Sequence, residues 1–553
     1  MTLRRSRLKS TLPSKATLTP ASKPGGRQSN GAPEGDGQRP AEPSLSDSGV
    51  LQASSSGDTA QRTTTSKRRL QRRVTPLVVL QEPIQAGMRK VFDLRRFLIV
   101  IGLTIGVLLI PAPPGMSVVA HRAIALFVFT GSILALEPAP LPISALMVPI
   151  CQIALGIDTA TGAFAPFGSP VLFLILGSLF LAEALRKHGL TRRMALYIIV
   201  ATQGNMDKLL FGIMFVTGML SMWVLNTATA AVLIPVAITI AQRVQPQEKA
   251  QRALQLLILA IAFSSSIGGM GTIMGSGENA IAGGLLAAEG EFGFLSWMIF
   301  GVPVVFILIP LSWFLLTRAL PIGKVFIDTE PVSQELERLG GLKGPERVII
   351  GVLVVSVALW MTGSTLEKTF SFLPATLLSS AVVAIGAVAY LSIEEIVDWN
   401  DLRGVNWGVF FVIGAGLTVG ESLAKTGASE WFAAQLAPTL GGMTFPAILA
   451  VLMLLGFTLT QFMNNVTIGA IMAPVLITLA QATGMPPASL VIPTIMSLAL
   501  AFMLPSASAR MTMVSVTGAV DQRTMLRTGL IVGLPSVLLL YGFFFVLAYL
   551  GLF

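Results

Sequence analysis

Long apolar segments follow one another almost without interruption from about residue 97 to the C-terminus. Hydrophobic residues make up 53% of the 553-residue chain and charged residues only 12%, whereas soluble domains carry about a quarter charged residues. A helix that crosses the hydrocarbon core of a bilayer needs ~20 mostly apolar residues. The sequence therefore predicts an all-α polytopic membrane protein.

Three of the apolar segments, residues 208–241, 254–288 and 444–480, are too long or too interrupted for a single span. Each has glycine, proline or polar residues near its middle, which is typical of discontinuous or re-entrant helices in transporters. The first contains SMWVLNTATAAVLIPVA (221–237) and the third TQFMNNVTIGAIMAPVL (460–476); in both, an asparagine precedes a proline by nine residues. We therefore expect two re-entrant hairpins beside about 11 transmembrane helices.

Three pairs of motifs recur in the same order at nearly constant offsets. AEALRKHGL (182–190) matches GESLAKTGA (420–428), the Asn226 cluster matches the Asn465 cluster, and GSGEN (275–279) aligns with ASARM (507–511). Internal symmetry of this kind is common in secondary transporters. It predicts a first repeat over residues 96–318 that holds one hairpin, and a second repeat over residues 347–553 that holds the other, joined by a loop over residues 319–346.

Lysine and arginine are distributed unequally around the two hairpins. The flanks of the first hairpin are basic, with Arg192 and Arg193 before it and Arg243 after it. The second hairpin has Lys425 before it and no basic residue in QATGMPPASL (481–490) after it. Because cytoplasmic loops are enriched in lysine and arginine, we expect the first hairpin to enter from the inside and the second from the outside. The repeats are then inverted, and the loop over residues 319–346 is cytoplasmic.

Polar residues at the two hairpin tips indicate an ion site at membrane depth, because irregular backbone survives there only where it lines a protein cavity. Asn226 and Asn465 are expected to begin the returning half-helices, where asparagine is a favourable N-cap and unpaired N–H groups attract an anion. The hydroxyls of Ser221 and Thr460, with nearby carbonyls, are hard oxygen ligands for a small cation. The alternative is that these side chains only make helix–helix hydrogen bonds.

In this order, the motifs resemble the divalent anion:sodium symporter family, the elevator-type carriers of dicarboxylates, citrate and sulfate. The resemblance covers about residues 97–553 and includes GGMGTIMGSGEN (268–279) and ELERLGGLKGPERV (335–348). It implies two sites for sodium as the coupling ion, one formed by Ser221, Asn226 and Gly275, the other by Thr460, Asn465 and Ala507. It also implies that the substrate is bound by Asn226, Thr227, Ser276, Asn464, Asn465 and Ser508.

The sequence departs from the family pattern at positions that face the substrate. Leu225 replaces the serine of the first Ser-Asn-Thr tip motif, the second tip reads Asn464-Asn465-Val466, and the Gly-Thr-Pro-Pro-Asn loops have become GSGEN and ASARM. Glu278 and Arg510 stand at equivalent positions of these loops, and ionisable residues at membrane depth count as functional by default. Arg510 is therefore a further candidate substrate ligand. The structural alternative is a buried Glu278–Arg510 pair whose charges cancel.

We expect a secondary active transporter of small divalent anions, either di- and tricarboxylates or sulfate, that works by sodium-coupled symport and alternating access. An anion exchanger or a proton-coupled anion carrier on the same fold is the alternative. The chain has one cysteine and two histidines, which leaves little scope for a metal cluster or histidine-based catalysis, and it lacks a phosphate-binding GxxxxGK[ST] motif. The sequence therefore predicts no enzyme, no cofactor beyond the coupling sodium ions, and no nucleic-acid partner.

The N-terminal segment, residues 1–95, is rich in Ser, Thr, Pro, Gly and Arg and has few large apolar residues, which predicts a disordered basic tail. SKRRLQRR (66–73) places this tail on the cytoplasmic side, so we expect a multi-pass protein of the cell (inner) membrane. The Arg- and Ser-rich start leaves an organellar membrane as the alternative. The predicted partners are the lipid bilayer, a small anionic substrate and, from the family resemblance, a second copy of the chain in a homodimer.

Overall fold

The structure is a computed structural model that describes residues 92–552, apart from residues 291, 324, 328, 373 and 441. The tail predicted over residues 1–95 therefore lies almost wholly outside the described residues. The described part is helical except for two short antiparallel strands, β1 (Val244–Gln245) and β2 (Phe326–Ile327), in which Val244 stands opposite Ile327. The prediction of an all-α polytopic membrane protein is confirmed.

Nine helices of the described residues are long and apolar enough to cross a membrane. They are α4 (Val118–Leu136), α9 (Met206–Trp223), α11 (Ala250–Gly269) with its preceding turn, α13 (Phe294–Ala319), α15 (Gly344–Thr369), α18 (Trp407–Lys425), α20 (Phe445–Phe462), α21 (Asn465–Ala482) and α24 (Gln522–Tyr549). Four shorter apolar helices are α5 (Leu141–Ala154), α10 (Asn226–Ala241), α16 (Ser380–Ile393) and α22 (Pro487–Leu498). Three hairpin arms, α9, α20 and α21, are among the nine long helices, and the fourth, α10, is among the shorter ones. Helix length alone therefore does not separate hairpin arms from spans, and the expected number of about 11 transmembrane helices stays a prediction.

One further apolar stretch is bent. The short helices α6 (Ala160–Phe164) and η1 (Ala165–Gly168) meet α7 (Pro170–Lys187) at 43°. Pro170 starts α7, where its missing N–H costs no helical hydrogen bond. Four further helices, from both halves of the chain, are α3 (Leu94–Leu109), α8 (Leu190–Ala201), α17 (Trp399–Arg403) and α19 (Ala428–Leu440). A 3-10 turn, η2 (Gln247–Lys249), precedes α11.

The order of elements is the same in the two halves of the chain. In the first half, α9 and α10 form a helical hairpin, α11 leads through the turn η3 (Ile273–Gly275) into α12 (Gly277–Glu289), and α13 follows. In the second half, α20 and α21 form the hairpin, α22 leads through η4 (Pro505–Ala507) into α23 (Ala509–Val516), and α24 follows. Each half thus has one hairpin and one broken helix. That the two halves have opposite orientations in the membrane stays a prediction.

The two broken helices lie at the centre of the packing. The apolar window of α11 is 83% buried, whereas that of α15 is 22% buried, so α11 is surrounded by protein and α15 presents an apolar surface to its surroundings. α11 packs against α9, α10 and α13, and α22 packs against α20, α21 and α24. Between the two broken helices the rings of Phe263 and Phe502 stack with centroids 4.3 Å apart.

Each hairpin also reaches the broken helix of the other half. α21 packs on α12, and α10 packs on α23. Gly469 makes the first contact possible, because a Cβ atom at this position would lie 2.7 Å from the Cβ of Glu278. The centre of the protein is therefore built jointly by the two halves.

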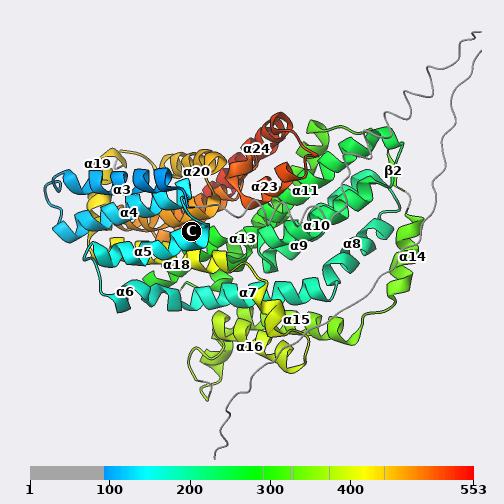
Figure 1. Ribbon diagram of the computed structural model, residues 1–553, viewed down its shortest axis with the longest axis horizontal. Helices are drawn as coiled ribbons and strands as arrows, with labels where there is room; N and C mark the ends of the chain where they lie inside the picture. The colour runs from blue at the N-terminus through cyan, green and yellow to red at the C-terminus, as the bar shows by residue number, and fades with distance from the viewer. Residues whose placement is uncertain are drawn as a thin grey trace, which may run out of the picture. The chain divides into compact units, whose positions relative to one another are not determined.

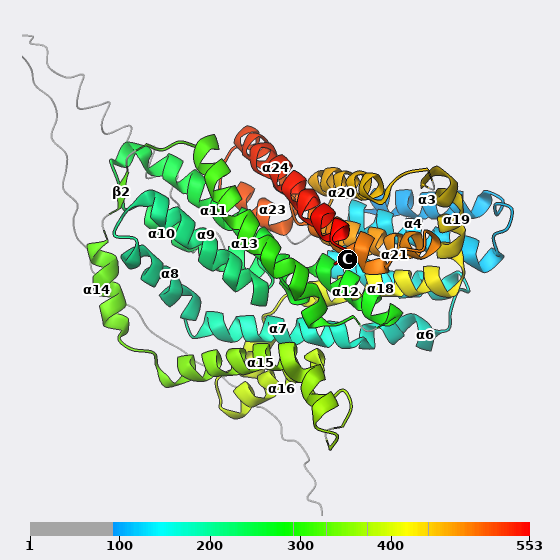
Figure 2. The same cartoon turned by 180° about the vertical axis from the view of Figure 1, so that it is seen from behind.

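Further helices surround this centre. α7 runs beside α16 and α15, which lie on the side of α7 away from α9 and α11 (Figures 1 and 2). α3, α4, α5 and α18 pack together around a separate apolar cluster that includes Leu126, Phe129 and Val412. The joining segment, residues 320–343 between α13 and α15, contains β2 and α14 (Glu330–Leu339), and α14 packs on α8.

Candidate functional site

The first tip joins α9 to α10. α9 ends at Trp223, Val224 and Leu225 leave the helical conformation, and Asn226 is the first residue of α10. Leu225 holds the N-cap position, so no side-chain hydrogen bond caps this helix. Asn226 is buried, and its Oδ1 accepts a hydrogen bond from the hydroxyl of the half-buried Thr227 at 3.2 Å.

The second tip is capped differently. α20 ends at Phe462, and Asn464 holds the N-cap position before α21. The side-chain oxygen of Asn464 accepts a hydrogen bond from the backbone N–H of Val466 at 2.9 Å. Asn464 is half-buried, whereas Asn465, the first residue of α21, is buried.

The prediction that Asn226 and Asn465 act as N-caps is wrong by one residue at each tip. A capping side chain precedes the helix that it caps, and the preceding residues are Leu225 and Asn464. Because the amide of Asn465 is not used for capping, it bonds elsewhere: its Nδ2 donates to Oε1 of Glu278 at 2.8 Å. The prediction that both asparagines begin the returning helices is confirmed.

The break in the first broken helix is held by two polar side chains. Nδ2 of Asn279 donates to the carbonyls of Gly269 and Thr272, each at 2.9 Å. The hydroxyl of Thr272 donates to the carbonyl of Met222 at 2.5 Å and so ties the break to the first hairpin. Carbonyls that leave the helical ladder in an apolar environment need such partners, and Asn279 and Thr272 provide them.

At the break in the second broken helix, Gln461 bonds to three backbone groups. Its Nε2 donates to the carbonyl of Leu500 at 3.1 Å, and its Oε1 accepts from the N–H groups of Phe502 at 3.2 Å and Met503 at 3.1 Å. Gln461 follows Thr460 on the incoming arm of the second hairpin, where the first hairpin has Met222 after Ser221. The two breaks are therefore equivalent in position but are stabilised by different side chains.

Two of the residues predicted to bind the first sodium ion lie against the first broken helix. The hydroxyl of Ser221 donates to the carbonyl of Ser265 at 2.6 Å. A Cβ atom placed on Gly269 would lie 3.0 Å from the oxygen of Gly275 and 3.4 Å from Nδ2 of Asn226. Asn226 and Gly275 therefore both lie close to the Cβ position of Gly269, and Ser221 contacts the same helix.

The second set repeats this arrangement in part. The hydroxyl of Thr460 donates to the carbonyl of Leu498 at 2.9 Å. Ala507 is buried in η4, which packs on α20, the helix that carries Thr460. Asn465 lies at the adjacent tip, but its amide bonds to Glu278 of the first half. No group of three or more His, Cys, Asp and Glu side chains suited to a metal ion occurs in the described part of the chain. The oxygen atoms near Ser221 and Thr460 are those of hydroxyl and carbonyl groups.

Two serines begin the second halves of the broken helices. Ser276 is the N-cap residue of α12 and Ser508 that of α23, and both have extended backbone conformations. Oγ of Ser508 accepts the N–H of Met511 at 3.4 Å. Ser276 is fully buried, and its hydroxyl lies close to the carboxyl group of Glu278. The two predicted substrate positions thus lie at helix N-termini, where partial positive charge attracts anions.

Glu278 and Arg510 are buried, with 0% and 1% of their surfaces exposed. Nη2 of Arg510 donates to the hydroxyl of Ser266 at 2.6 Å, and that hydroxyl donates in turn to the carbonyl of Ala499. Each charged group also keeps an unpaired atom in the described structure, Oε2 of Glu278 and Nε of Arg510. The two charges interact through space, but the ion pairs of the described residues do not include them as direct partners. Each is held instead by a neutral side chain of the other half.

Sequence reasoning missed the residues that support the site. Gln461 stands next to Thr460 inside an apolar run, and Asn279 closes the GSGEN motif. Both are polar residues at membrane depth, which is the signal that identified the tips, but the equivalent positions of the other repeat hold methionine, Met222 for Gln461 and Met511 for Asn279. Ser266 of α11 bonds to Arg510 and to the carbonyl of Ala499, and it belongs to a run of three buried serines that suggested no particular role.

The centre of this all-helical membrane protein contains two buried helix breaks and two hairpin tips. This arrangement is typical of secondary transporters. Residues 92–550 match the sodium:sulfate symporter transmembrane region. The chain belongs to this family, the divalent anion:sodium symporters, and is a transporter rather than an enzyme.

The chain is similar to several known transporters. An uncharacterised transporter of Haemophilus influenzae is 30% identical over 76% of this chain and 90% of its own length. The sodium-dependent dicarboxylate transporter SdcS of Staphylococcus saprophyticus is 29% identical over 68% of this chain and 76% of its own length. Among solved structures, the YdaH transporter of Alcanivorax borkumensis is similar at 15% identity with a TM-score of 0.49, over 70% of this chain and 86% of that one.

Proposed function

We propose that the protein is a sodium-coupled symporter of small divalent anions, either di- and tricarboxylates or sulfate, that works by alternating access. The main support is the matched pair of hydroxyl contacts, Ser221 to the carbonyl of Ser265 and Thr460 to the carbonyl of Leu498. Each joins a hairpin tip to the broken helix of its own half. A hydroxyl that donates its proton to a carbonyl still has lone pairs to offer, so each contact suits a small cation.

The first sodium ion is proposed to lie among Ser221, Asn226 and Gly275, and the second among Thr460, Asn465 and Ala507. Each set combines a tip residue with the turn of a broken helix, and backbone carbonyls are abundant in both turns. Hard oxygen ligands of this kind suit alkali and alkaline-earth cations better than transition metals.

The substrate anion is proposed to lie between the two tips. Asn226 and Thr227 approach it from the first tip, Asn464 and Asn465 from the second, and Ser276 and Ser508 from the starts of α12 and α23. The position of Ser276 supports this assignment, because it is buried at the N-terminus of α12, where backbone N–H groups attract an anion. Arg510 adds a charged donor with an unpaired Nε atom, and a guanidinium group binds carboxylate and sulfate oxygens through two parallel N–H bonds.

The alternating access proposed here is of the elevator type, in a homodimer in the cell (inner) membrane with the N-terminus in the cytoplasm. The sequence supports this orientation through its basic residues near the first hairpin. An organellar membrane remains the alternative for the same fold.

Proteoliposome uptake of labelled succinate, citrate and sulfate tests the proposal. Symport predicts uptake that depends on an inward sodium gradient and does not need any anion inside the vesicle. The matched control is the same preparation with potassium in place of sodium. Equal uptake in the two salts would contradict sodium coupling.

The second candidate function, an anion exchanger or proton-coupled carrier, is favoured by the buried guanidinium group of Arg510. A fixed cation at the site offsets part of the charge of the anion, which reduces the need for a cotransported cation. Glu278 beside Asn465 brings a carboxyl group, which can carry a proton, next to the second proposed sodium site. Exchange predicts uptake that requires internal anion and is indifferent to sodium, and proton coupling predicts uptake driven by an inward pH gradient alone.

A further inference from the structure

A cavity of about 310 Å³ lies away from the hairpin tips, between α8, the end of α10 and the segment that joins the two halves. α8 contributes Arg192, Leu196 and Ile199 to its wall. These residues are four and then three positions apart, so they share one face of the helix. The wall from α8 is therefore a regular stripe with a charged residue at one end and apolar residues beyond it.

α10 forms the opposite wall in the same manner. Val236, Thr239 and Ile240 line the cavity from one face of the helix, and Arg243, two residues beyond the end of α10, lines it as well. The joining segment closes the remaining side with Ile327 of β2 and, on α14, with Val332 and Glu335. Small-molecule sites typically combine apolar walls with a few polar groups in volumes of about 300–1,000 Å³, and this cavity has those properties.

Specific contacts fix the joining segment on both sides of the cavity. On one side, β2 pairs with β1, and the N–H of Ile327 donates to the carbonyl of Gly204 at 3.2 Å. On the other side, buried Arg193 donates to the carbonyl of Gly340 at 2.6 Å and pairs with Glu346 at 3.1 Å. The cavity is thus enclosed by a framework that exists before any ligand arrives.

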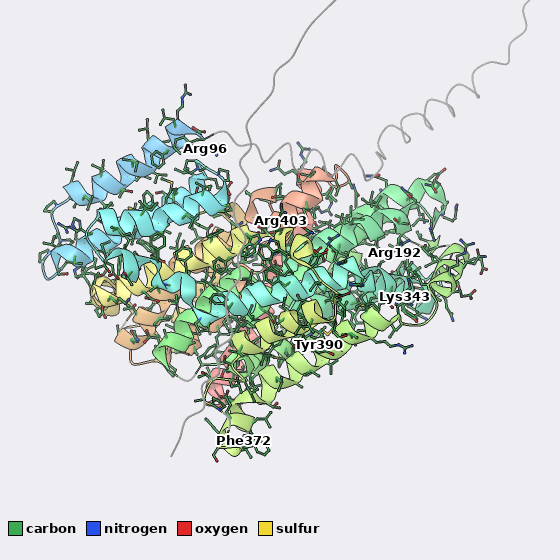
Figure 3. All side chains as sticks on the ribbon, turned by 60° about the horizontal axis from the view of Figure 1, so that its bottom comes forward. Arg96, Arg192, Lys343, Phe372, Tyr390 and Arg403 are labelled. Carbon is green, nitrogen blue, oxygen red and sulfur yellow. The ribbon has the colours of Figure 1, made fainter. Side chains whose placement is uncertain are left out.

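The two arginines of the cavity have different roles. Arg192, which is 67% exposed, pairs with Glu335 at the solvent side, and it lies toward the same end of the molecule as Lys343, the residue before α15 (Figure 3). A pair as exposed as this contributes little energy. Arg243, in contrast, is half-buried, and its buried Nη1 has no hydrogen-bond partner among the described residues. A buried donor of this kind takes water or a ligand as its acceptor, and the positive charge of the guanidinium group favours an anion.

We propose that this cavity binds an anionic amphiphile, with a phosphate or carboxylate group on Arg243 and a short hydrocarbon part between Leu196, Val236 and Ile240. Two sources offer this chemistry: an anionic phospholipid of the bilayer and a soluble alkyl phosphate or carboxylate. The ligand contacts α8, α10 and the joining segment at once. It therefore fastens the joining segment to the returning arm of the first hairpin.

The test uses the full-length protein in nanodiscs of neutral phosphatidylcholine. In one arm monohexyl phosphate is titrated, and in the other the discs contain increasing phosphatidylglycerol; the thermal midpoint of unfolding reports binding in both. A saturable rise with monohexyl phosphate identifies a soluble ligand, and a rise with phosphatidylglycerol identifies a lipid. Either result supports the site, provided that Arg243→Gln weakens binding by about tenfold or more, the effect of losing one charge-assisted hydrogen bond.

Two further variants make the test decisive. Arg252→Gln removes the same charge from an exposed position of α11 and is expected to bind as the wild type does. Val236→Trp keeps Arg243 but fills the cavity, and it is expected to abolish the rise in the thermal midpoint. The proposal is overturned if neither probe stabilises the protein, if Arg243→Gln and Arg252→Gln lose binding equally, or if Val236→Trp still binds.

Discussion

Replacing Gln461 with leucine tests how firmly the break between α22 and α23 is held. Gln461 is 4% exposed, and leucine fills nearly the same space without polar atoms. The substitution removes the hydrogen bonds to Leu500, Phe502 and Met503. It also leaves two backbone N–H groups and one carbonyl unpaired in an apolar environment.

The expected loss follows from these three unpaired groups. A buried polar group left without its partner costs about 1–3 kcal/mol, so Gln461→Leu should lower the free energy of unfolding by about 3–9 kcal/mol. Met222→Leu is the matched control, since Met222 stands at the equivalent position of the first hairpin and is also buried. A swap of methionine for leucine usually costs less than about 1.5 kcal/mol.

The two variants are compared by titrating the purified protein with SDS and following tryptophan fluorescence. Because Thr460 adjoins Gln461 and contacts Leu498, sodium-dependent uptake should also need a higher sodium concentration in Gln461→Leu. A loss of stability no larger than that of Met222→Leu would refute the idea that Gln461 holds the break.

Asn226→Ala and Asn465→Ala should each abolish most uptake at normal membrane abundance, and Asn465→Ala should lower the thermal midpoint more because it strands Glu278; near wild-type uptake in either variant contradicts the site. Arg510→Gln should fold and show a strongly raised substrate KM in uptake assays. The double variant Glu278→Gln, Arg510→Gln should not restore transport, and restoration would identify a charge-cancelling pair instead. Deletion of residues 1–60 should leave the uptake rate unchanged, whereas a large loss at equal abundance would indicate a regulatory or targeting role.

Local chemistry made the hairpin tips predictable from the sequence. Asparagine near a proline inside a long apolar run has few explanations at membrane depth, because each polar or irregular position there needs a protein partner. The structure accordingly starts α10 at Asn226 and α21 at Asn465, with Pro235 and Pro474 inside those helices. The all-helical fold followed from the same requirement.

The partners across the two halves could not be predicted in this way. The repeat aligns Glu278 with Arg510, which left open a buried pair or a substrate ligand at Arg510, but it carries no information on which neutral side chain each one meets. Those partners, Asn465 and Ser266, come from the packing of α21 on α12 and of α23 on α11. The cap was placed one residue too far along at each tip because the capping residue precedes the first helical residue, and Asn226 and Asn465 are the first helical residues.

The hydrogen bond from Asn465 to Glu278 joins residues 187 positions apart. At a synthesis rate of about 5–20 residues per second, the asparagine leaves the ribosome roughly 10–40 s after the glutamate. Throughout that interval α12 carries a carboxylate whose protein partner does not yet exist, and the Ser266 hydroxyl likewise waits for Arg510 and Ala499. The first half of the chain therefore enters the membrane incomplete, and a ribosome that pauses between the two halves prolongs this vulnerable state.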